Sequence, residues 1–156
     1  MEKIVGIGEY AISEFEGDLI KTFALASCVA ITAYNPLLKV AGMIHIALPS
    51  PSDREEGLRR PGYYATSGIP LLINKMGKEY GSRVEDLQIK IFGGALSIRN
   101  ADYFTIGSRN CSAVRDTLVS MNLRVLEAQT GGTVIRNIEM DVQTGLIIMK
   151  TLPINF

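Results

Sequence analysis

The chain has 156 residues, 47% of them hydrophobic, and its 16 Lys plus Arg balance its 16 Asp plus Glu. A chain of this length buries about 70% of its unfolded surface, so we expect one domain over residues 1–156. The even charge gives no positive face for nucleic acid, and no apolar run approaches the roughly 20 residues of a membrane-spanning helix.

Location and ligands follow from the same composition. The amino terminus, Met1-Glu2-Lys3-Ile4, lacks the basic and long apolar sections of a secretory signal, so we expect a cytoplasmic protein without direct membrane insertion. A reducing compartment favours free thiols at Cys28 and Cys111. One histidine and two cysteines make no convincing set of metal ligands, and we expect neither a metal nor a cofactor.

Extended segments dominate the first third of the chain. Residue alternation and turn residues predict strands over residues 3–14, 18–25, 28–34 and 40–48. Residues 49–62 are rich in Pro, Ser, Gly and charge, which is typical of a surface loop. A long loop beside a candidate site can serve as a lid or a binding surface.

Helices and strands alternate in the rest of the chain. Apolar spacing predicts a helix over residues 65–80, with Ser67 as its N-cap and Pro70 in its first turn. A second helix is predicted over residues 108–121, where Arg109 and Asn110 are expected to cap or brace it. Further strands are predicted over residues 87–92, 123–128, 133–142 and 146–151, the last two joined by a hairpin turn. Many strands with two main helices predict an α+β fold with mixed sheets.

Two residues of the types found in cysteine hydrolases lie in neighbouring predicted strands. Cys28 begins one strand, and His45, the only histidine, lies inside the next. A thiol is nucleophilic as the thiolate, and an imidazole can take its proton near neutral pH, so the pair indicates acyl transfer. Cysteine and a lone histidine are also common as core residues, and the two residues alone leave both interpretations open.

Strand alternation offers a test of this pair. It places His45 and Met43 on the face with fewer bulky side chains, while the large aliphatic residues of the strand point the other way. Cys28 likewise shares a face with Ala30. The pattern predicts a core on one side of the strands and an open or polar site on the other.

Motifs along nearly the whole chain carry a resemblance to a known family. They are Gly6-Ile7-Gly8-Glu9-Tyr10, Thr22-Phe23-Ala24-Leu25-Ala26-Ser27-Cys28-Val29-Ala30, His45-Ile46-Ala47-Leu48-Pro49, Pro61-Gly62-Tyr63-Tyr64-Ala65, Phe92-Gly93-Gly94-Ala95, Ile106-Gly107-Ser108-Arg109-Asn110 and Thr130-Gly131-Gly132 with Arg136 and Thr144-Gly145. In this order and spacing they resemble the CheD family, the chemoreceptor glutamine deamidases of bacterial chemotaxis.

The resemblance implies an activity and three catalytic residues. Cys28 is the nucleophile, His45 the general base and then acid, and Thr22 the residue that orients the imidazole. The implied enzyme is a protein-glutamine glutaminase, which hydrolyses glutamine side chains to glutamate and ammonia through a thioester. The implied fold is a mixed β-sandwich flanked by helices, similar to toxin-type cysteine deamidases. Thr22 follows from the resemblance alone, because threonine is a common strand residue.

The resemblance also implies partners. They are the cytoplasmic helical region of methyl-accepting chemoreceptors and a CheC-type phosphatase. Two other functions stay open: a non-catalytic chemotaxis adaptor that binds receptors or CheC, with Cys28 and His45 as relics, and a transglutaminase-like activity in which a lysine amine replaces water.

Three residues bear on how closely the family pattern applies. Ala26 stands where the family usually has glycine, which is harmless if the position has an ordinary φ and displaces the nucleophile if φ is positive. Gln129 stands where an acidic residue is common, a change that leaves the triad intact and concerns a partner surface. Cys111 lies on an apolar helix stripe with no histidine to spare, so it is expected to be structural.

Overall fold

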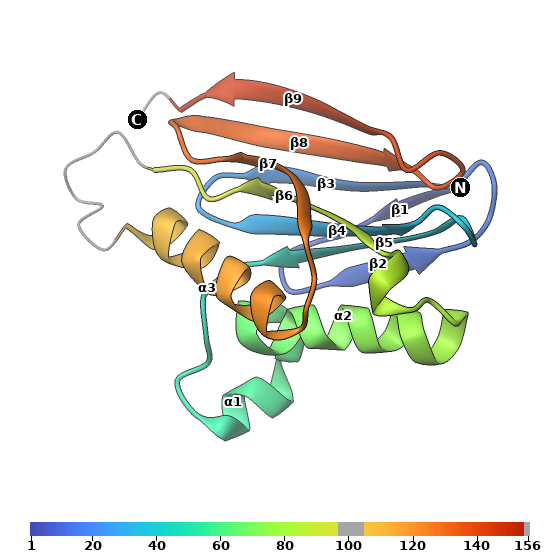
Figure 1. The fold of residues 1–156 in the computed structure, drawn as a ribbon. Helices are drawn as coiled ribbons and strands as arrows, with labels where there is room; N and C mark the ends of the chain where they lie inside the picture. The colour runs from blue at the N-terminus through green and yellow to red at the C-terminus, as the bar shows by residue number, and fades with distance from the viewer. Residues whose placement is uncertain (97–104, 155–156) are drawn as a thin grey trace.

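The computed structural model describes residues 1–96 and 105–154, which form two mixed β-sheets and their helices. The four-stranded sheet has the order β1-β3-β8-β9, and the five-stranded sheet has the order β2-β5-β4-β6-β7. The helices cover the face of the five-stranded sheet that lies away from the four-stranded sheet (Figure 1). The predicted α+β class with two main helices is confirmed.

The strands and helices have the following bounds. The strands are β1 Glu2–Ile4, β2 Tyr10–Ser13, β3 Leu19–Leu25, β4 Val29–Asn35, β5 Val40–Ile46, β6 Gln88–Gly93, β7 Val125–Thr130, β8 Val134–Asp141 and β9 Ile147–Pro153. The α-helices are α1 Arg54–Arg59, α2 Ala65–Tyr80 and α3 Ile106–Ser120, with short 3-10 helices at Pro61–Tyr63 and Val84–Asp86. Among the described helices, none is long and apolar enough to cross a membrane.

The two central strands, β4 and β5, are buried along their whole length. Their large aliphatic side chains, such as Ile31 and Ile44, pack against the helices, as alternation predicts. The other face does not form an open site: Ala30 and Met43 pack between the sheets against Ile20 of β3. The prediction of an open face is therefore wrong, because a second sheet built from distant segments covers it.

The predicted extended segment over residues 3–14 is two strands in different sheets. β1 pairs in parallel with β3, whereas β2 pairs antiparallel with β5. The connection between them passes closely under the 3-10 helix that precedes α2: a side chain at Gly62 would place its Cβ 2.3 Å from the carbonyl oxygen of Gly8. Only glycine at position 62 allows this approach.

Helix α2 spans the predicted residues, but its start differs. Tyr64 is the N-cap, and Pro70 lies inside the helix and not in its first turn. The Ser67 hydroxyl donates to the carbonyl of Pro61 at 2.6 Å, so it ties the helix to the preceding turn. Pro70 removes the hydrogen bond to Thr66, which is exposed and can be hydrated instead.

The predicted loop over residues 49–62 contains helix α1. The Asp53 carboxylate accepts a hydrogen bond from the Glu56 main-chain N–H at 2.8 Å, which is an N-cap. Acidic residues occupy the first turn, and Arg59 occupies the last turn. In these positions each charge interacts favourably with the helix dipole. A helix of 6 residues is too short for apolar periodicity to reveal it.

Candidate active site

Thr22 and His45 come from different sheets and meet in the buried space between them. Thr22 is 0% exposed and His45 is 2% exposed. The Thr22 Oγ1 atom lies 2.7 Å from His45 Nδ1 and donates to the carbonyl of Val5 at 2.6 Å. A hydroxyl has one hydrogen and a carbonyl only accepts, so the hydrogen of Thr22 goes to Val5 and His45 Nδ1 donates to Thr22.

This contact leaves the second ring nitrogen of His45 as the basic atom. Nε2 is buried and has no hydrogen-bond partner among the described residues. Burial also lowers the pKa of His45 to about 4, because the charged imidazolium loses its hydration. The imidazole is therefore neutral at neutral pH, with a free lone pair on Nε2.

Cys28 directly precedes β4, which pairs with the strand that carries His45. Ala30 pairs with His45 across the β4–β5 ladder, and Cys28 precedes it by two residues on the same inner face. The thiol is half-buried, and burial raises its pKa. His45 Nε2 makes no hydrogen bond to Cys28 in this structure. The pair is a neutral thiol beside a neutral imidazole, not an ion pair.

The main chain around Cys28 is held by the turn after β6. The carbonyl of Cys28 accepts from Gly94 N–H at 2.9 Å, and that of Ala26 accepts from Ala95 N–H at 2.7 Å. A Cβ at Gly93, where φ is 114°, would lie 2.2 Å from the Cys28 carbonyl oxygen. The N–H groups of Ser27 and Cys28 donate to no described residue.

Of the two outcomes stated for Ala26, the structure has the harmless one. Ala26 is absent from the positive-φ residues of the described chain, so alanine strains nothing there. The strained position is Ala24, with φ 59°, in a β3 bulge where the register to β8 shifts. Its N–H donates to the Asn137 side chain at 2.8 Å. This left-handed residue lies between Thr22 and Cys28 in the chain.

Asn110 was expected to brace its own helix, but it contacts the site. It is 0% exposed, and its Nδ2 group donates to the carbonyls of Ser27 at 2.9 Å and Ala47 at 3.0 Å. Sequence reasoning missed this role. The available signal was an asparagine on the buried side of α3 between Gly107 and Val114.

Cys111 lies in a packed environment away from His45's strand. Burial is the main cause that raises the pKa of its thiol, and its Sγ packs against Gly94, where a Cβ would lie 2.2 Å away. Its environment also contains the buried guanidinium of Arg136, which donates to the carbonyls of Gly93 and Gly131. His, Cys, Asp and Glu side chains in residues 1–96 and 105–154 form no group of three or more that could hold a metal ion.

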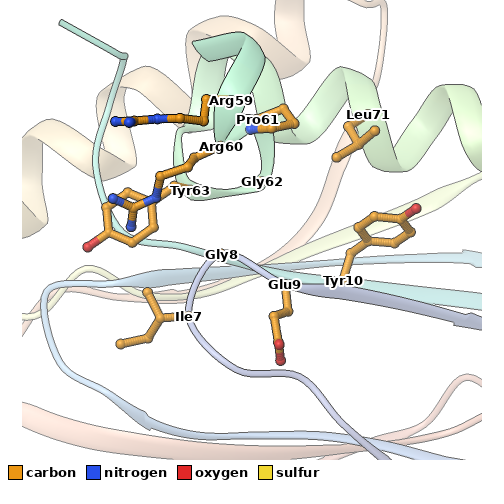
Figure 2. A pocket seen from close by; sticks show the side chains of 10 residues that line it. All are labelled: Ile7, Gly8, Glu9, Tyr10, Arg59, Arg60, Pro61, Gly62, Tyr63 and Leu71. Carbon is orange, nitrogen blue, oxygen red and sulfur yellow. The ribbon is translucent and has the colours of Figure 1, made fainter. Parts of the chain in front are cut away.

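A groove of about 640 Å³ lies between residues 7–10 and the segment that joins α1 to α2 (Figure 2). It is lined by Ile7, Gly8, Glu9, Tyr10, Arg59, Arg60, Pro61, Gly62, Tyr63 and Leu71. The Arg60 guanidinium lies 4.0 Å from the centre of the Tyr63 ring, a cation–π contact. None of the three predicted catalytic residues lines the groove.

Main-chain hydrogen bonds connect this groove to the buried pair. The N–H of Gly8 donates to the carbonyl of His45 at 2.8 Å. The carbonyl of Tyr63 accepts from the N–H of Ala47 at 3.0 Å. The groove therefore adjoins the end of β5 that carries His45.

Comparisons with known proteins agree on one family. A family model described as CheD chemotactic sensory transduction matches residues 47–151, a segment that begins just after His45. The chain is 41% identical over 146 residues to a probable chemoreceptor glutamine deamidase CheD of Syntrophotalea carbinolica, covering 92% of this chain and 90% of the relative. It is 36% identical over 150 residues to the chemoreceptor glutamine deamidase CheD of Thermotoga maritima, covering 96% and 92%.

One solved structure shows a weaker likeness. The hypothetical protein YfiH of Bacillus licheniformis matches with 12% sequence identity and a TM-score of 0.49, covering 80% of this chain and 49% of that protein. A likeness at this level supports no conclusion about fold or function.

Proposed function

The chain belongs to the CheD family, and we propose that it is a chemoreceptor glutamine deamidase, a protein-glutamine glutaminase that converts glutamine side chains to glutamate and ammonia. The observation that carries this proposal is the buried imidazole of His45. Its Nδ1 is held by Thr22, its Nε2 has no partner among the described residues, and Cys28 directly precedes the neighbouring strand. The catalytic domain proposed for this activity is the whole of residues 1–156.

The proposed first step is attack by Cys28 on the side-chain carboxamide carbon of a glutamine. Because thiol and imidazole are both neutral at rest, His45 Nε2 takes the thiol proton as the S–C bond forms. The N–H groups of Ser27 and Cys28, which donate to no residue in the described part of the chain, are suited to donate to the oxyanion that develops. The imidazolium then gives its proton to the amide nitrogen, the C–N bond breaks, and ammonia leaves.

The second step is hydrolysis of the thioester on Cys28. His45 Nε2 takes a proton from water as the water oxygen attacks the thioester carbon, and the C–S bond then breaks. The proton returns to the Cys28 sulfur, and glutamate is released. Thr22 carries no charge, so its proposed role is to keep the His45 ring in one orientation and one tautomer.

The fold supports the proposal at a coarse level. Two mixed sheets with helices on one outer face are the arrangement expected for a β-sandwich of the toxin-type cysteine deamidases. We include this likeness in the proposal.

The proposed substrate is the cytoplasmic helical region of a chemoreceptor, which places the protein in the cytoplasm. Relatives of this chain are named chemoreceptor glutamine deamidases. The groove with Arg59 and Arg60 adjoins the strand end that carries His45, so it is suited to hold a part of the receptor next to the reacting glutamine. A CheC-type phosphatase is a second proposed partner.

A non-catalytic adaptor is the alternative function. An adaptor has no use for a buried imidazole nitrogen without a partner, which costs stability in any fold. This unpaired Nε2 favours the enzyme.

The test is incubation of the protein with a receptor cytoplasmic fragment, followed by peptide mass spectrometry. We expect glutamine-to-glutamate conversion and ammonia release with the wild type and neither with His45→Ala. Receptor binding without conversion would support the adaptor instead. Isopeptide products formed in the presence of a lysine analogue would identify a transglutaminase-like activity.

A further inference from the structure

We propose that Asn110 is a positioning residue that holds the strand end carrying Cys28 at a set separation from the strand end carrying His45. The proposal rests on the deamidase function proposed above. Asn110 belongs to α3, which is far from both strands in sequence, and its amide group lies between the two strand ends.

The β4–β5 ladder ends where the catalytic residues begin. Its last pair toward the site is Val29 with Ile46. Beyond this pair the carbonyls of Ser27 and Ala47 have no strand partner, and both accept from Asn110 Nδ2, at 2.9 and 3.0 Å. The amide thus replaces the next rung of the ladder and fixes how far the strand ends separate.

The orientation of the Asn110 amide is determined by these contacts. Two carbonyl oxygens can only accept, so the nitrogen with its two hydrogens must face them. The Oδ1 atom then points away and is buried without a partner among the described residues. No other residue type of this size supplies two donors from one atom without a charge.

The helix that carries Asn110 is itself fixed against the site. A Cβ at Gly107 would lie 2.2 Å from the carbonyl oxygen of Ala95 and 2.6 Å from that of Gly94. The N–H groups of Gly94 and Ala95 hold the other side of the Cys28 segment. The main chain at Cys28 is therefore held between the turn after β6 and Asn110. Only the side chain of Cys28 is not fixed by these contacts.

The test compares Asn110→Ala and Asn110→Ser with the matched variant Asn35→Ala. Asn35 is also buried, at 1% exposure, and its side chain also makes hydrogen bonds, but it lies at the opposite end of β4. All variants carry Cys111→Ala so that Cys28 is the only thiol. The measurements are kcat and KM for a receptor fragment, the rate of Cys28 alkylation by iodoacetamide, and thermal unfolding.

We expect Asn110→Ala to lower kcat by about 10- to 100-fold with KM within about twofold, because displaced reacting atoms cost rate and not binding. The alkylation rate should rise, because separated strand ends expose the thiol. Asn110→Ser keeps one hydrogen-bond donor, so its kcat should fall less than that of Asn110→Ala. Asn35→Ala should lower the unfolding midpoint and leave kcat and alkylation per folded molecule unchanged.

The proposal is overturned if Asn110→Ala keeps kcat and alkylation at the wild-type values per folded molecule, as Asn35→Ala does. If Asn110→Ala does not fold, Asn110→Ser is judged by the same criterion. A wild type that does not convert glutamine would reject the deamidase function, while alkylation of Cys28 would still decide whether Asn110 positions it.

Discussion

Thr22 determines which nitrogen of His45 carries the proton, because its own hydrogen is committed to Val5. Replacing Thr22 with valine keeps the shape and removes the hydroxyl. The Nδ1 proton and the Val5 carbonyl then both lose their partner, and the ring is free to change its tautomer. We expect Thr22→Val to lower kcat by about 10- to 100-fold, less than the roughly 10²- to 10⁴-fold that general acid–base catalysis contributes, because the imidazole itself remains.

Thr22→Ser should retain most of the rate, because it keeps the hydroxyl. Thr117→Val is the matched control, since Thr117 donates to Ala113 within α3 and makes no contact with His45. Steady-state kinetics on a receptor fragment check these variants. Equal kcat values for Thr22→Val and the wild type would remove Thr22 from the mechanism.

Ala24 is the strained residue of the segment that leads to Cys28. Its φ of 59° costs an L-residue about 1–2 kcal/mol, whereas glycine adopts it freely but loses about 0.5–1 kcal/mol of chain entropy. Ala24→Gly should therefore raise the free energy of unfolding by a few tenths to about 1 kcal/mol.

Ala26→Gly is the contrasting variant, because Ala26 has an ordinary φ. It should lower the free energy of unfolding by roughly 0.5–1 kcal/mol. Urea denaturation measures both changes. A larger increase in the free energy of unfolding from Ala26→Gly than from Ala24→Gly would contradict the assignment of the backbone strain to Ala24.

The segment from α1 to the start of α2 provides the cationic side of the groove (Figure 2). If receptor segments bind there, Arg60→Ala should raise KM a few-fold and leave kcat nearly unchanged, because rim charges affect association more than chemistry. Lys78→Ala removes the same charge near the other end of α2, roughly 20 Å along the helix, and should change neither constant. Equal effects of the two variants on KM would exclude the groove as the binding surface.

Most helices and strands of this chain can be predicted because the local sequence pattern of apolar residues and turn residues indicates them. The strands β4, β5 and β6 and the helix α2 follow from such patterns, and Cys28 and His45 follow as neighbours on paired strands. Local sequence patterns do not predict α1, which has only 6 residues, and they do not predict that residues 3–14 are divided between two sheets.

The site depends on contacts that local patterns do not contain. Thr22 meets His45 only because the second sheet packs on the first, and it was identified from the family resemblance. Asn110 reaches the strand ends from a helix more than 60 residues away from His45. Such contacts belong to the tertiary packing, so neither spacing nor periodicity indicates them.

In the described part of the molecule, the buried side-chain polar atoms that lack a hydrogen-bond partner lie toward one end of the sandwich. Within the described residues these atoms are His45 Nε2, Asn110 Oδ1 and Arg136 Nε. Each belongs to a side chain that contacts the strand ends or turns around Cys28. Unpaired buried groups cost stability and are typical of functional sites. The buried polar atoms without hydrogen bonds thus lie where we propose that catalysis takes place.

Acid should destabilise the whole fold through His45. Its pKa is about 4 in the folded state, and an unfolded histidine has an ordinary value of 6.5. Between these values the unfolded chain binds the proton and the folded chain does not, so stability is complete above pH 6.5 and falls as the pH drops toward 4. The loss from this one group should be about 3 kcal/mol.

Urea denaturation of the wild type and of His45→Gln at several pH values between 4 and 7 isolates this contribution. His45 is the only histidine, so the difference in pH dependence between the two proteins reports it alone. Parallel curves for the two proteins would show that the imidazole is not held neutral.

Deamidation of a receptor fragment by the two matched cysteine variants tests the central claim most directly. Both cysteines are partly buried free thiols, but of the two only Cys28 adjoins β4, the strand that pairs with the strand of His45. With peptide mass spectrometry following glutamine-to-glutamate conversion over time, Cys111→Ala should convert at close to the wild-type rate and Cys28→Ala should convert none. Conversion by Cys28→Ala, or its loss in Cys111→Ala while that variant stays folded, would contradict the assignment of Cys28 as the nucleophile.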